Sequence, residues 1–133
     1  MWLALLFSVI NGFMSFIANY VIRLSCLDIA PVAIILIAWR GESIFFGAFM
    51  MVLVYNLVSP KDFGFLWIVF PLTLLTGYLA LVIHSFFVLL LIYHIIGLMF
   101  AYFFAYLNPR YMMFALANFS LNVLLGKAYN FFF

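Results

Sequence analysis

The sequence predicts an all-α fold: a polytopic transmembrane helical bundle of about six segments, two of them short. Hydrophobic residues make up 72% of the 133 residues and charged residues only 6%, whereas soluble domains average about 45–50% apolar and about 25% charged. A soluble fold of this size would expose a large apolar surface and aggregate, and a bilayer removes that cost. We therefore expect one transmembrane domain over residues 1–133.

Apolar runs and the polar breaks between them set the expected segments, because a spanning helix needs roughly 20 apolar residues. The first run, 2–22, has no charged side chain before Arg23. It lacks the positive start of a signal peptide and is expected to be a retained helix. Two short runs, 29–39 and 43–58, form a hairpin that either spans twice as tilted helices or is re-entrant. Three longer runs follow, at 63–83, 86–107 and 111–129.

Polar and small residues spaced three or four apart mark one face of each terminal segment. These seams consist of Ser8, Asn11, Ser15 and Asn19 in the first segment, and of Asn118, Asn122 and Gly126 in the last. Polar groups inside lipid are costly and usually face protein, so each seam is expected to pack against another helix. The alternative is a polar pocket or a partner-binding groove between the first and last helices.

Few residues of the chain can carry chemistry. The acids Asp28, Glu42 and Asp62 fall at segment ends beside basic residues, where water or headgroups are expected to reach them. Cys26 is the single cysteine and forms neither an internal disulfide nor a metal site. The net charge of +2 is too small for a nucleic-acid surface. No phosphate loop, zinc motif or paired-carboxylate motif is present, so we expect no enzyme, no catalytic residue, no metal and no cofactor.

Two features are ambiguous in the sequence. His84 and His94 lie about 15 Å apart along one helix and cannot share a metal. Each could ligate a haem or chlorophyll with a ligand from another chain, but we expect His84 to cap a helix boundary and His94 to hydrogen-bond within the bundle. The run Arg40-Gly41-Glu42 is expected to be a solvated turn, and it becomes a functional candidate only if the hairpin is re-entrant.

A run near the middle of the chain, Asn56-Leu57-Val58-Ser59-Pro60, is followed four residues later by Gly64. It resembles the Asp-Leu-Leu-Ser-Gly-like run and later Gly of the rod-shape-determining MreD family, with Asn56 at the Asp position and Pro60 at the first Gly. The upstream pair Arg40-Gly41 resembles the Arg-Gly that opens the same helix in that family. The downstream run Gly77-Tyr78-Leu79-Ala80 resembles the family's Gly-Tyr-Leu-Ala run. The resemblance covers residues 40–80.

The resemblance implies a small protein of the bacterial inner membrane, with a fold similar to the substrate-binding subunits of energy-coupling-factor transporters. It implies a non-enzymatic scaffold that binds other integral membrane proteins, notably the single-span protein MreC, and supports cell shape and peptidoglycan elongation.

Two other functions remain open from the residues themselves. One is a small-molecule-binding subunit of an energy-coupling-factor-type transporter, with its ligand between the polar seams. The other is an accessory subunit of a redox or light-harvesting complex, with His94 or His84 as the ligand.

Overall fold

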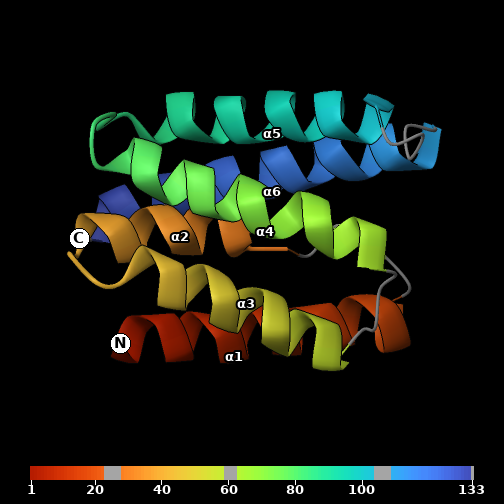
Figure 1. Ribbon diagram of the computed structural model, residues 1–133, viewed down its shortest axis with the longest axis horizontal. Coiled ribbons are helices and arrows are strands. Elements are labelled where there is room, and N and C mark those ends of the chain that lie inside the picture. Colours follow the sequence, from red (N-terminus) through yellow and green to blue (C-terminus); the bar gives the residue numbers. More distant parts are fainter. Residues whose placement is uncertain (23–27, 59–62, 104–108, 133) are drawn as a thin grey trace.

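The computed structural model describes residues 1–22, 28–58, 63–103 and 109–132, and every regular element in these ranges is helical (Figure 1). The prediction of an all-helical chain with six segments is therefore confirmed for the described residues. The elements are α1 (Trp2–Phe16), which continues as a π-helical segment η1 (Ile17–Ile22), then α2 (Ala30–Trp39), α3 (Ile44–Val58), α4 (Phe63–Ala80), α5 (Phe86–Phe103) and α6 (Pro109–Phe132).

The ends of several helices differ from the expected ones. α4 ends at Ala80 rather than at residue 83, because residues 81–83 fold back in a turn whose N–H groups bond to Tyr78 and Leu79. α6 begins at Pro109, two residues earlier than expected. Proline favours the first turn of a helix, because its missing N–H would have no intrahelical partner there.

α2 is the central helix of the structure. It contacts each of the other five α-helices, and all residues from Ala30 to Ala38 are buried. α1 packs on α3, α4 lies between α3 and α5, and α6 packs on α5 (Figure 1). A helix that is apolar on every face is expected where protein surrounds it on all sides.

α2 spans only about half the length of the bundle. Its 10 residues give it a length of roughly 15 Å, whereas the 24 residues of α6 give roughly 36 Å. Its last residue lies at the end of the bundle where α1 begins, so its first residue lies near the middle (Figure 1). The hairpin is thus a half-length helix followed by the longer α3, and the Arg40–Glu42 turn lies at the end of the bundle rather than inside it.

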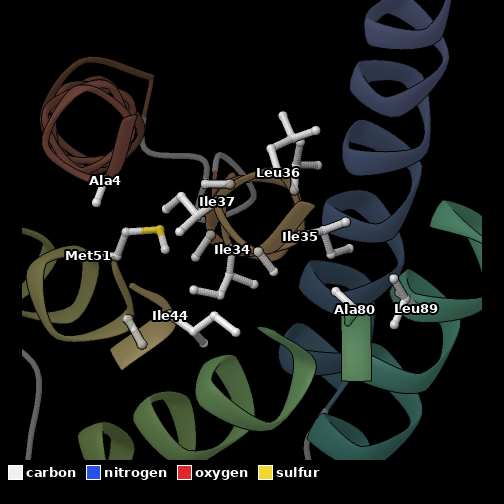
Figure 2. Close-up of a cluster of buried hydrophobic side chains, with 14 of the residues drawn as sticks. Ala4, Ile34, Ile35, Leu36, Ile37, Ile44, Met51, Ala80 and Leu89 are labelled. Carbon is white, nitrogen blue, oxygen red and sulfur yellow. The ribbon is translucent and has the colours of Figure 1, made fainter. Parts of the chain in front are cut away.

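The apolar core forms around α2. Figure 2 shows Ile34, Ile35 and Ile37 of α2 among side chains contributed by the neighbouring helices, including Met51 of α3 and Leu89 of α5. These five side chains are fully buried. Because α2 occupies the centre, each neighbouring helix turns one face towards it and the opposite face outwards.

One helix within the described ranges, α5, is both long and apolar enough to cross a membrane, with a mean hydropathy of 2.3 over 18 residues. Four other apolar stretches are shorter: α1, α2, α3 and the part of α4 from Ile68 to Ala80.

Candidate functional site

The two polar seams meet at the start of α2. Asn11 of α1 accepts a hydrogen bond from the Ile29 N–H through its Oδ1, at 2.9 Å. Asn118 and Asn122 of α6 donate to the Asp28 carbonyl through their Nδ2 atoms, at 3.0 and 2.9 Å. We call Asp28, Asn11, His94, Asn118 and Asn122 the polar centre.

The location of α2 inside the bundle explains why these side chains gather there. The first N–H groups of a helix have no intrahelical partner and carry partial positive charge. Here Asn11 satisfies one of them, and the Asp28 Oδ1 accepts a second from Ala30 at 2.9 Å. The two asparagines of α6 donate to the carbonyl of Asp28, which lies just before α2. Side chains thus do at the start of α2 what water does at an exposed helix end.

The alternative, a groove between the first and last helices, is not formed in the described part of the chain. α1 and α6 make no direct contact there, and α2 touches both. The asparagines of both seams meet the start of α2, whereas Ser15 contacts Tyr55 of α3 and Gly126 lies against Phe86. The expectation of packing against another helix therefore describes the seams better than a shared pocket does.

The structure places Asp28 differently from the expectation. Its position at a segment end suggested that water or headgroups would reach it, but α2 begins inside the bundle and Asp28 is partly buried there. Asp28 instead faces a cavity of about 50 Å³, whose polar lining also includes Tyr93, His94, Tyr111 and Asn118. A carboxylate in this position is a candidate for function, because charged groups in a bundle interior are costly.

His94 connects α5 to the polar centre, as the expectation of a hydrogen bond within the bundle requires. Its Nδ1 lies 2.8 Å from the Leu90 carbonyl oxygen, and its Nε2 lies 3.2 Å from Asn118 Oδ1. The ring packs edge-on against Phe119, with 5.2 Å between the centroids. His84 is exposed in the turn between α4 and α5.

The charged turn after α2, expected to be solvated, contacts the start of α1. The Oε2 of Glu42 lies 2.7 Å from the N-terminal ammonium of Met1. Its carboxylate also accepts hydrogen bonds from the N–H groups of Leu3 and Ala4, at 3.3 and 3.2 Å, and so caps α1. The hydrogen-bonded ammonium, together with these N–H groups, lowers the pKa of Glu42. Arg40 donates to the Tyr129 hydroxyl at 3.3 Å instead.

The remaining residues singled out in the sequence lie apart from the polar centre or outside the description. Ser8 and Ser15 are buried in α1, Gly126 is buried in α6 and Asn56 is half-buried in α3. Gly41 is exposed and adopts a positive φ of 71°, which favours glycine in this turn. Ser59, Cys26 and Asp62 lie outside the described residues, and the surroundings of Asn19 and Gly64 are not described.

A second concavity lies on the outside of the helix pair α5 and α6. It has a volume of about 390 Å³ and is almost entirely apolar. We call it the α5/α6 groove; its lining comprises Leu91, His94, Ile95, Leu98, Met112, Met113, Ala115, Leu116 and Phe119. His94 therefore borders both the inner cavity and the outer groove.

The described residues contain no group of three or more acidic, histidine or cysteine side chains placed to hold a metal ion. Compared with protein-family models, curated proteins and solved structures, the chain matches none of them.

Proposed function

We propose that the chain is an integral membrane protein that serves as a non-enzymatic scaffold subunit of a larger membrane complex, similar in role to MreD. The distribution of side chains carries the membrane part of this proposal. Asn11, Asn118 and Asn122 are buried, while Trp2 and Met113 are 84% and 74% exposed. Water penalises an arrangement with polar groups inside and large apolar groups outside, whereas a bilayer favours it.

The filled interior supports a scaffold over a transporter subunit. Pockets for small molecules usually measure about 300–1,000 Å³, and the cavity at Asp28 measures about 50 Å³. The asparagines that would have recognised a ligand are hydrogen-bonded to the backbone at the start of α2. This arrangement favours partner contacts on the outer surface.

The surroundings of His94 argue against the pigment or haem subunit. A ring nitrogen must present a free lone pair to bind a metal. Both nitrogens of His94 instead lie within hydrogen-bonding distance of protein oxygens, those of Leu90 and Asn118.

The α5/α6 groove is the surface we assign to the partner, a single-span transmembrane helix of the MreC type. The groove lies between two adjacent helices and is lined by apolar side chains. Met112 and Met113 border it, and methionine side chains adapt their shape to a packed surface. Helix association in lipid depends on such close packing.

Leu116→Trp tests this assignment, because Leu116 lines the groove and is 69% exposed. Leu124→Trp is the matched control, since Leu124 lies on the same helix, is 65% exposed and does not line the groove. We expect a tagged chain, extracted from its native membrane in mild detergent, to co-purify a single-span coiled-coil protein together with wall-synthesis enzymes. Leu116→Trp should reduce that recovery and Leu124→Trp should not.

Equal recovery with both variants would remove the groove as the binding surface. Recovery of ATPases with a coupling subunit would favour the transporter, and a visible absorbance band in the purified protein would favour the pigment or haem subunit.

A further inference from the structure

Arg40 carries a positive charge that no carboxylate of the described residues neutralises. The acid nearest to it in the sequence, Glu42, is held by the Met1 ammonium at 2.7 Å and by two N–H groups of α1. The Arg40 side chain is exposed, and its Nη2 donates to the Tyr129 hydroxyl at 3.3 Å. Because a guanidinium has several N–H donors, donors remain for a ligand outside the chain.

The contact with Tyr129 holds this charge in one place. Tyr129 belongs to α6, and its side chain packs against the buried core around α2. Arg40 directly follows the last residue of α2, so the contact joins the ends of two helices that touch along the bundle. A side chain that is already positioned loses less conformational freedom when it binds a ligand.

Aromatic side chains at the same end of the bundle place Arg40 at the level of lipid headgroups. Trp39, next to Arg40, donates its indole N–H to the carbonyl of Ala80 at the end of α4, at 2.9 Å. Trp2, at the start of α1, is 84% exposed, and Tyr78, in the last turn of α4, is 53% exposed. Tryptophan and tyrosine are enriched where the hydrocarbon core of a membrane meets its headgroups, which is also where the lipid phosphates begin.

We propose that Arg40 binds the phosphate group of an anionic membrane lipid at this end of the bundle. The planar guanidinium matches the oxygens of a phosphate and forms a pair of parallel hydrogen bonds with them. A headgroup with a net negative charge is favoured over a zwitterionic one, because the described residues leave the charge of Arg40 without a carboxylate. The site rests on the membrane part of the proposed function and is independent of the scaffold part.

Lys127 offers a matched comparison on the last turns of α6. It is exposed, carries the same charge and lies two residues before Tyr129. Two residues turn an α-helix by about 200°, so Lys127 points away from the side of α6 on which Tyr129 meets Arg40. A lipid bound at Arg40 depends on one of these two cations, whereas a general attraction to anionic lipid depends on both.

The test is a lipid titration of the purified full chain in a neutral detergent, with bound lipid counted by native mass spectrometry. Phosphatidylglycerol and phosphatidylcholine with identical acyl chains both carry a phosphate, but only phosphatidylglycerol has a net negative charge. We expect phosphatidylglycerol to bind about fivefold more tightly, and inorganic phosphate not to displace it. Equal affinities for the two lipids would overturn the proposal. Displacement by inorganic phosphate would also overturn it, because the site would then bind a free anion rather than a lipid.

Arg40→Gln tests the assignment to this residue. It should weaken the binding of phosphatidylglycerol about fivefold, and Lys127→Gln should change it by less than about twofold. Equal losses in the two variants would show a general attraction to anionic lipid and would refute the site at Arg40. Arg40 is exposed, so Arg40→Gln is expected to keep the fold, which circular dichroism checks. The comparison of the two lipids on the unaltered chain decides the lipid preference even if this variant does not fold.

A separate measurement distinguishes failure of this proposal from failure of the proposed function. Release of the chain from membranes by alkaline extraction would refute the membrane location on which both depend. A chain that stays in the membrane and binds the two lipids equally would refute the lipid site alone.

Discussion

Replacing Asn118 by leucine tests the polar centre most directly, because this amide makes three contacts there. It donates to the Asp28 carbonyl, accepts from Asn122 and faces the Nε2 of His94. Leucine has a similar size, so Asn118→Leu removes the polar contacts without opening a large cavity. Asn122 still reaches the Asp28 carbonyl in this variant, and the nitrogen of His94 loses its acceptor.

The expected loss of stability follows from those contacts. Two of the three contacts leave α6, those with Asp28 and His94. Hydrogen bonds between helices in membranes are worth about 0.6 kcal/mol each on average, which gives roughly 1 kcal/mol for two. A buried polar group left without a partner adds about 1–3 kcal/mol. We therefore expect Asn118→Leu to lower the free energy of unfolding by about 2–4 kcal/mol.

Ser120→Leu is the control for this variant. Ser120 lies on the same helix but is exposed, and its hydroxyl donates only to the Leu116 carbonyl one turn earlier, at 2.9 Å. Its replacement should change stability by no more than about 0.5 kcal/mol. Reversible unfolding in mixed micelles, followed by helical circular dichroism, measures both variants.

The two variants together decide whether the seam of α6 holds α2. Surface substitutions scatter by about 0.5 kcal/mol. If the free energies of unfolding of Asn118→Leu and Ser120→Leu differ by less than that, the polar centre contributes no stability and our reasoning fails. A large loss in both variants would instead show that leucine is not tolerated on α6 in general.

Two further predictions concern packing and pH. Gly126→Ala should destabilise the chain by about 1–3 kcal/mol in thermal melts, because the added methyl would overlap the rigid Phe86 ring. Gly97→Ala should be close to neutral, because its nearest neighbour is the end of a flexible leucine side chain at 3.2 Å; equal losses would refute the packing argument. The pKa of Glu42 in the folded chain lies below the ordinary 4.5. The ionised carboxylate therefore stabilises the fold fully above pH 4.5. This contribution is lost as the pH falls through the lower, folded-state pKa. Glu42→Gln should flatten this acid-side fall in melting temperature, and an unchanged slope would exclude the ion pair with Met1 as its source.

Residue spacing predicted which faces of the terminal helices are buried. Steps of three and four place Ser8, Asn11 and Ser15 on one side of α1, and the structure buries all three. The spacing could not identify the opposing elements: the asparagines meet the start of α2, whereas Ser15 contacts Tyr55 of α3. The spacing of polar residues along one helix shows which face of that helix is buried, but not which neighbouring helix that face meets.

The short segment 29–39 was predicted, but its consequence for Asp28 was missed: a short helix that ends at one end of the bundle has its other end inside it. Residues at the ends of apolar runs are usually placed where water is, and that rule fails when a helix starts inside a bundle. The run 29–39 did contain a signal. A segment that is apolar on all faces and too short to span must be surrounded by protein, and an acid immediately before it then lies in the interior.

Glu42 contacts the start of α1 rather than its sequence neighbour Arg40 for an electrostatic reason. Neighbouring opposite charges on an exposed turn gain little from each other, because water screens them. The start of α1 offers Glu42 an ammonium group and two N–H groups with no intrahelical partner. These donors are far apart from Glu42 in sequence, and only the fold brings them together.

The polar centre follows from the place where α2 begins. A helix that begins inside the bundle leaves its first N–H groups and the carbonyl before it without water, and buried backbone groups of this kind need partners. Asn11 accepts from the Ile29 N–H, and Asn118 and Asn122 donate to the Asp28 carbonyl. The buried Oδ1 of Asn122 has no partner among the described residues. Amide side chains suit this position because each one carries both a donor and an acceptor, so α1 and α6 can satisfy opposite kinds of backbone group with the same residue type.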